Sequence, residues 1–190
     1  YKVSDIEGYP LGWDKRDLDL ALEAWAPHDF GMWFPVGQWR CRLHRAGHIP
    51  GAAMVEIETP EARILWSGDM DTRDSPNAAG ATPVECDILC LEGTYGGRSH
   101  RPREEEEARF VAKVLEVVSR GGIALVPSFA SGRGQDILRI LHREAPHLDV
   151  HYDGMGTRVT REWMGCPELI RDAEGMKRAF RWSKRVSGKS

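Results

Sequence analysis

Four short loops contain the residues whose types suit metal and phosphate chemistry, and these loops are 45–51, 67–71, 92–97 and 127–135. In the first loop, His48 lies between Gly47 and Gly51, which let the backbone turn tightly and leave the imidazole free to ligate a metal ion. In the second, Asp69 follows an apolar run and a glycine, so its carboxylate stands at a strand end, where it can bind or bridge metal ions. Each feature alone is ordinary, and the order and spacing of all four loops carry the argument.

The third and fourth loops supply a carboxylate and a group that suits phosphate. Glu92 follows an apolar run, a place from which a carboxylate can hold a metal-ligating imidazole in one tautomer. Ser131 and Arg133 open a helical pattern, where backbone amides and a guanidinium group bind phosphate well. A structural hydrogen bond from Arg133 to the end of a sheet explains the same residue equally well. The loop is not a nucleotide-binding P-loop, because no Gly-Lys-Ser or Gly-Lys-Thr follows.

The residues around the first two loops predict one helix and three short strands. Asp14 suits the cap of a helix whose apolar positions run from 18 to 25, and Pro27 ends it. Polar and apolar residues alternate over 39–43, 53–58 and 63–66, which is the period of half-buried strands. These strands would place His48 and Asp69 on the loops at their ends.

After loop 71–83, which is rich in Asp, Ser, Pro, Asn and Gly, the pattern changes to alternating strands and helices. Apolar runs predict strands at 87–91, 123–126 and 148–152. Helices are predicted over 102–120 and from 134 to 142, the first with a solvated opening turn of four acids, residues 104–107, that suits the helix dipole. Uninterrupted apolar strands separated by helices indicate an α/β fold with a mainly parallel sheet covered on both faces.

The composition is that of an ordinary folded domain, or of parts of two. The chain has 190 residues, a net charge of −3 and 41% hydrophobic residues, which excludes an intrinsically disordered chain. No run approaches the ~18 apolar residues of a membrane helix, and no secretory signal is visible. Four cysteines are too few for a disulfide scaffold and favour a cytoplasmic location. The slightly acidic balance does not indicate nucleic-acid binding, although a local basic groove is compatible with it.

Taken together, the four loops resemble the β-CASP group of metallo-β-lactamase-fold nucleases, which includes the 3′-end cleavage factor of messenger RNA and bacterial ribonuclease J. The similarity rests on segments 44–53, 67–69, 91–96 and 127–136, and segment 153–160 resembles the RNA-processing branch. The resemblance implies the C-terminal part of an αββα metallo-β-lactamase sandwich over residues 1–96. The start of a β-CASP domain with a mainly parallel sheet would then occupy residues 97–190.

The resemblance also implies roles for single residues. It makes His48 a zinc ligand, Asp69 a catalytic carboxylate that bridges two zinc ions, and Glu92 the acidic residue of the β-CASP motif. Two zinc ions bridged by a carboxylate and a hydroxide lower the pKa of bound water and stabilise charge during phosphoryl displacement. Single-stranded RNA is the implied partner, with Ser131 and Arg133 as contacts for its phosphates.

Two parts of the family's pattern are missing from these residues. Neither a His-x-His-x-Asp-His run nor a downstream His-x-Ser-Gly-His motif occurs. The sequence begins without Met and ends in a basic stretch, so we expect a piece of a longer zinc-dependent ribonuclease that is inactive by itself. Two alternatives stay open, a non-catalytic β-CASP scaffold subunit of an RNA-processing complex and a DNA-repair nuclease of the same family. No membrane is expected as a partner, and a homodimer is left open.

Several of these residues also have purely structural interpretations. Cys41, His44 and His48 have the spacing of a small zinc site, but the alternation around Cys41 favours an ordinary strand. Cys86 and Cys90 are expected to be buried thiols. The tryptophans at 13, 25, 33 and 39 are expected to pack in a core or an interface instead of stacking on bases, and the C-terminal Lys and Arg residues to form charged helix surface.

Overall fold

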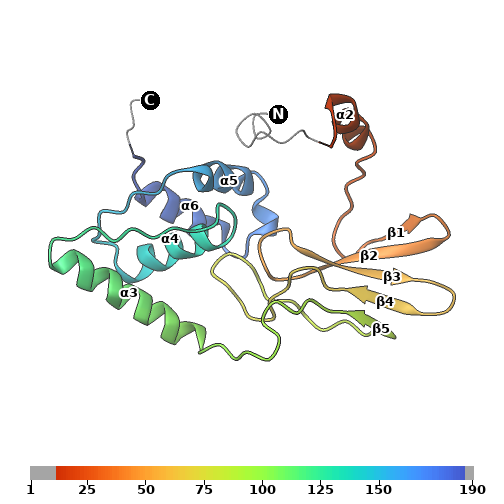
Figure 1. Cartoon of the computed structure of the whole chain (residues 1–190), viewed down its shortest axis with the longest axis horizontal. Helices are drawn as coiled ribbons and strands as arrows, with labels where there is room; N and C mark the ends of the chain where they lie inside the picture. The colour runs from red at the N-terminus through yellow and green to blue at the C-terminus, as the bar shows by residue number, and fades with distance from the viewer. Residues whose placement is uncertain (1–11, 187–190) are drawn as a thin grey trace.

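The structure, a computed structural model, describes residues 12–186, which form a sheet part and a helical part (Figure 1). The sheet part contains α2 (Lys15–Glu23), β1 (Trp33–Val36), β2 (Trp39–Arg45), β3 (Ala53–Glu58), β4 (Arg63–Trp66) and β5 (Ile88–Cys90). The helical part contains α3 (Arg103–Ser119), α4 (Arg133–Glu144), α5 (Met155–Met164), the 3-10 helix η1 (Pro167–Leu169) and α6 (Ala173–Trp182). The prediction that the chain contains both α-helices and β-strands is confirmed.

The five strands form one mixed sheet in the order in which they occur along the chain. Strands β1 to β4 pair antiparallel through short turns, and β5 pairs parallel to β4. The strands predicted over 39–43, 53–58 and 63–66 are confirmed, because the alternation of polar and apolar residues matches the two faces of a pleated sheet. The register pairs Arg42 with Glu56 and Arg40 with Glu58, so opposite charges face each other along one side of the sheet.

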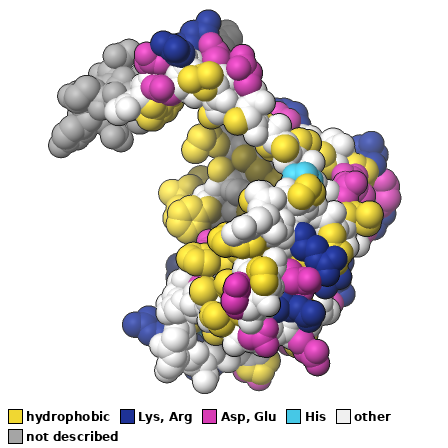
Figure 2. Space-filling view, turned by 90° about the vertical axis from the view of Figure 1, so that its right-hand side faces the viewer, with side chains coloured by type: hydrophobic (Ala, Val, Ile, Leu, Met, Phe, Trp, Pro, Cys, Tyr) yellow, Lys and Arg dark blue, Asp and Glu magenta, His cyan; other side chains and the backbone are white. Residues whose placement is uncertain are grey.

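The other face of the sheet is apolar and open. Val36, Trp39, Trp66 and Ile88 lie on this face by register and are 44–59% exposed. Figure 2 shows hydrophobic side chains gathered on the hollowed side of the molecule below α2. The prediction of a sheet covered on both faces is therefore wrong for the residues that the structure describes.

The predicted mainly parallel sheet is also wrong within residues 12–186. Segment 123–126 forms no strand, and its Ile123 and Leu125 are 92% and 89% exposed. Segment 148–152 contributes only an isolated parallel bridge between His151 and Lys184. An apolar run becomes a strand only where another strand supplies its backbone partners, and the described part of the chain places none beside 123–126.

Helix α2 begins after Asp14 as predicted, but it ends at Glu23, before Trp25 and Pro27, and it buries none of its residues. Asp14 and Asp17 form a capping box, in which each side chain accepts a hydrogen bond from the backbone amide of the other residue. Trp13 and Trp25 at its two ends are 46% and 73% exposed, and Trp39 on β2 is 44% exposed. Trp25 and Trp39 therefore do not pack in a core of the described chain, and the alternative that the tryptophans pack in an interface stays a prediction.

The helical part has its own hydrophobic core. Val111 and Val114 of α3 pack against Ile140 and Leu141 of α4, and α6 packs on the other side of α4. The predicted helices are confirmed, and three of the four opening acids of α3 are exposed as expected, Glu104, Glu105 and Glu106. The fourth, Glu107, is partly buried and forms an ion pair with Arg143 at 2.6 Å. This acid thus helps to join α3 to the end of α4.

The two cysteines beside and within β5 are less buried than predicted. Cys86 and Cys90 are partly buried, not fully buried as predicted, and β5 is largely exposed because it is an edge strand. Among residues 12–186, none of the helices has the length and apolar character needed to cross a membrane.

Candidate functional site

The loops that carry His48 and Asp69 run side by side. Gly47 and Met70, their immediate neighbours, form an antiparallel bridge, and the amide of Asp71 donates to the carbonyl of Ala46 at 2.9 Å. Gly47 has a φ of +74°, and a Cβ at this position would stand 2.6 Å from the backbone nitrogen of Ala81. Only glycine fits there, so the residue that lets the His48 loop turn also lets the two loops meet. Both His48 and Asp69 are exposed.

Glu92 is anchored on the Asp69 loop. Its Oε1 accepts a hydrogen bond from the amide of Met70 at 2.7 Å, and its own amide donates to Ser67 Oγ at 3.0 Å. The hydrogen bond from Met70, a second from Thr94 and the charge of nearby His48 together hold the pKa of Glu92 below its usual range, against a smaller opposing effect of burial. The three predicted residues therefore share one edge of the sheet, with Glu92 as a carboxylate.

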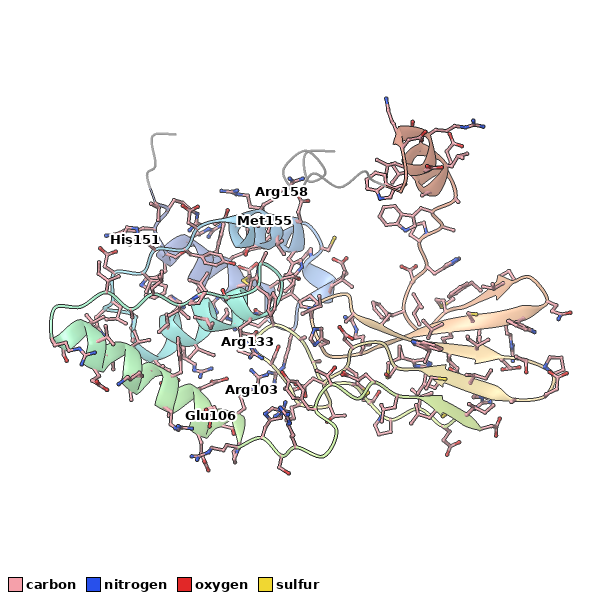
Figure 3. The ribbon with its side chains drawn as sticks, in the orientation of Figure 1. Arg103, Glu106, Arg133, His151, Met155 and Arg158 are labelled. Carbon is pink, nitrogen blue, oxygen red and sulfur yellow. The ribbon has the colours of Figure 1, made fainter. Side chains whose placement is uncertain are left out.

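The fourth loop reaches the same place from the helical part. Gly132 is the N-cap of α4 with a φ of +93°, and a Cβ there would come 2.8 Å from the side chain of Ile49, next to His48. Ser131 and Arg133 beside it are exposed, and no side chain caps this end of α4. Figure 3 shows Arg133 where the helices meet the loops of the sheet, with Arg103 close by. The start of α4, which no side chain caps, and the exposed cation of Arg133 suit an anion.

The residues present match a zinc shell in type but not in number. A His nitrogen and an Asp oxygen are proper zinc ligands, and a zinc site needs at least three from the protein. Among residues 12–186, however, no three His, Cys, Asp or Glu side chains gather closely enough to hold a metal ion. His48 and Asp69 can therefore supply part of a metal shell, while this chain by itself does not complete one.

The chain is similar in sequence to several known proteins. The chain is 30% identical over 185 residues, 95% of its length, to Probable RNase MJ4 of Methanocaldococcus jannaschii. It is 36% identical over 80% of its length to Cleavage and polyadenylation specificity factor subunit 3 of Dictyostelium discoideum. It is 32% identical over 82% of its length to a ribonuclease of Thermus thermophilus. No protein-family model matches the chain.

The chain is a homologue of the β-CASP ribonucleases. It spans less than half the length of these relatives, namely 43%, 21% and 37% of them respectively.

The structure of this β-CASP homologue excludes the small zinc site of the Cys-x2-His-x3-His spacing. Cys41 and His44 are three residues apart on β2, so they lie on opposite faces of the sheet. Cys41 is buried, and His44 Nε2 lies 2.6 Å from Glu56 Oε2 on the charged face. His44 is an ordinary strand residue, as the alternation indicates.

Sequence reasoning missed two buried polar clusters of the homologue. One surrounds Glu56, a fully buried carboxylate of β3. The other joins the loop after β4 to α4 and contains Asn77, Asp136 and Arg139. The first cluster could have been predicted from the charged residues that alternate along the two strands, at 40, 42, 56 and 58. The second could not, because Asn77 lies in a polar loop whose composition is typical of an exposed connection.

Proposed function

We propose that the full-length protein containing this chain is a zinc-dependent ribonuclease that hydrolyses phosphodiester bonds of single-stranded RNA. One observation carries the proposal: the loops of His48, Asp69 and Glu92 meet at one edge of the sheet, and the uncapped start of α4 with Arg133 lies against them. Ribonuclease names among the homologues support the same substrate class.

In this proposal His48 and Asp69 contribute ligands to two zinc ions, and further ligands come from outside these 190 residues. When bound, such ions activate water and stabilise the charge of an in-line phosphoryl displacement. Glu92 acts from this chain as a hydrogen-bond acceptor, because its lowered pKa keeps it charged beside the His48 loop. Arg133, Ser131 and the positive end of the α4 dipole bind the RNA phosphates.

We further propose that residues 1–96 belong to a metallo-β-lactamase sandwich and residues 97–190 to a β-CASP domain. The open apolar face of the sheet supports a second layer, since an apolar sheet face needs one. The cytoplasm is the proposed location, and cell fractionation tests it.

Replacement of Asp69 tests the ribonuclease. In the full-length protein, Asp69→Asn is expected to lower kcat/KM for a short single-stranded RNA about 1,000-fold or more, because the substitution removes a shared metal ligand without changing the size of the side chain. Metal analysis should show less zinc, and thermal unfolding should change little. The exposed Asp19→Asn on α2 is the matched control and should keep full activity.

Retained cleavage with unchanged zinc in Asp69→Asn would contradict the assignment. A single-stranded DNA of the same sequence is assayed in parallel. Faster cleavage of DNA would favour the DNA-repair alternative, and a wild-type protein that binds RNA but cuts neither strand would favour the scaffold.

A further inference from the structure

Asn77, the only asparagine in the chain, lies in the loop between β4 and β5 and is 1% exposed. Polar side chains in connecting loops usually face water, so a fully buried one needs partners. Asn77 finds them in the helical part. Its Nδ2 donates to Asp136 Oδ1 at 2.8 Å, and its Oδ1 accepts from Arg139 Nη1 at 3.2 Å.

The backbone of the same loop is held by further arginines. The carbonyl of Pro76 accepts from Arg139 Nη1 at 3.0 Å, and the carbonyl of Asn77 accepts from the amide of Arg171 at 2.9 Å. Arg171 also donates from its side chain to the carbonyl of Ser75 at 3.1 Å. The loop is thereby fixed to α4 and to the start of α6, and Asn77 is its one side chain that bonds directly to α4 in these contacts.

Asp136 connects this attachment to the candidate site. It lies one turn after Arg133 on α4 and is 8% exposed. Besides Asn77, Asp136 has a charged partner in Arg103 at 3.8 Å, which exceeds hydrogen-bond distance, and the charge of Arg133 also acts on it. Burial raises the pKa of Asp136, and the charge of Arg103 and the hydrogen bond from Asn77 offset this only in part. The short hydrogen bond from Asn77 is thus the contact by which the loop between β4 and β5 holds this turn of α4, which Gln135 also ties to Ala130 and Thr160.

The loop is equally fixed at its sheet end. The amide of Ala81 donates to the carbonyl of Asp71 at 2.8 Å, and Asp71 in turn is bonded to Ala46 in the His48 loop. A rigid chain of contacts therefore runs from the His48 and Asp69 loops through Asn77 to α4. Gly132, which has no Cβ and so leaves room for the side chain of Ile49, completes this series of contacts at the start of α4.

We infer that Asn77 is a positioning residue that fixes the start of α4, and with it Arg133, beside the loops of His48 and Asp69. Asn77 is buried and touches no substrate itself; it acts through Asp136. This inference rests on the proposed function only for the statement that Arg133 binds RNA phosphate.

The kinetic test is a double-mutant cycle in the full-length protein with a short single-stranded RNA. Asn77→Ala is expected to raise KM about tenfold with kcat changed less than about twofold, because a displaced Arg133 weakens RNA binding before it affects the metal site. Arg133→Ala should raise KM at least as much. The double variant should match Arg133→Ala, whereas a general loss of folding would make the two effects multiply.

Exchanging the side chains of Asn77 and Asp136 tests whether their hydrogen bond, and not packing alone, positions α4. Asn77→Asp places two carboxylates against each other and should raise KM more than Asn77→Ala, most strongly at high pH where both are ionised. Adding Asp136→Asn restores one donor and one acceptor, so the swapped pair should return KM to within about threefold of wild type. A swapped protein that unfolds at the wild-type temperature but keeps a high KM would overturn the inference, as would a KM unaffected in Asn77→Ala.

Hydrogen exchange tests the inference without using catalysis. In Asn77→Ala, the helix-bonded amides of residues 136–139 should exchange at least about tenfold faster than in wild type, while those of 110–118 in α3 stay unchanged and the swap restores protection. If wild type cuts no RNA, the proposed function fails, and hydrogen exchange still decides the role of Asn77. Unchanged exchange at 136–139 in Asn77→Ala would refute it.

Discussion

Glu56 in the sheet part and Asp136 in the helical part are both buried carboxylates, but their neighbours differ. Glu56 lies 2.6 Å from His44, 2.8 Å from Arg42 and 3.3 Å from Arg63. Burial acts to raise the pKa of Glu56, yet the hydrogen bonds and charges of His44 and Arg42 outweigh it and hold that pKa below its usual range. Around Asp136 the close partner is the neutral Asn77, and burial prevails, so the pKa of Asp136 is raised.

The comparison separates two uses of a buried acid. Glu56 is an ion-pair centre that ties β2, β3 and β4 together, far along the sheet from the helices. Asp136 is held chiefly by a hydrogen bond at the junction that carries the candidate site. Removing the charge of Glu56 should therefore lower the free energy of unfolding strongly, whereas removing the charge of Asp136 should change it little.

The largest expected effect on stability belongs to Glu56→Gln. The substitution leaves Arg42 and Arg63 without their common counter-ion, and breaking a fully buried pair costs about 3–5 kcal/mol. These two side chains are 30% and 44% exposed, so water compensates part of the loss and we expect about 2 kcal/mol. Urea unfolding measures this change in the free energy of unfolding. An unchanged urea midpoint in Glu56→Gln would show that the charge of Glu56 is no more important for stability than that of Asp136.

The pH dependence of stability should show opposite signs for the two acids. The lowered pKa of Glu56 gives a contribution that is present above its ordinary value of 4.5 and is lost as the pH falls through the lowered pKa. The raised pKa of Asp136 gives one that is present below its ordinary value of 3.8 and is lost as the pH rises through the raised pKa.

Asp136→Asn tests this sign, since it keeps an acceptor for Asn77 and removes the titration. Relative to wild type, the variant should gain stability as the pH rises through the raised pKa of Asp136. Glu56→Gln should instead be less stable than wild type near neutral pH, and this difference in stability should disappear as the pH falls through the lowered pKa of Glu56. A parallel pH profile for the two variants, measured by thermal unfolding, would contradict the assignment of opposite shifts.

The smallest effect is expected for Arg40 and Glu58, the exposed pair at the edge of the Glu56 cluster. Their side chains are 55% and 32% exposed at a separation of 2.6 Å. A double-mutant cycle of Arg40→Gln and Glu58→Gln should give a coupling of about 0.5 kcal/mol that vanishes in high salt. A coupling as large as that of Glu56 would show that burial does not control these pairs.

Local sequence patterns predicted the elements that need only local information. The alternation at 39–43, the capping residue Asp14 and the acidic opening of α3 each act on neighbouring residues, and the structure confirms the elements they predict. The apolar run 123–126 misled the prediction, because hydrophobicity indicates a strand without saying whether a partner lies beside it. The parallel sheet inferred from that run is therefore not observed in residues 12–186.

By itself the sequence determined which residues are chemically suited to the site, because a His, an Asp, a Glu and an Arg on glycine-bearing loops are visible without coordinates. Only the tertiary structure decided that these loops meet, through the bridge of Gly47 with Met70 and the contact of Gly132 with Ile49. It also decided that Asn77 is buried against α4, and that the pKa values of two similar carboxylates, Glu56 and Asp136, are shifted in opposite directions. Burial, hydrogen-bond partners and the distance between charges depend on residues far apart in the chain, and these quantities set the chemistry.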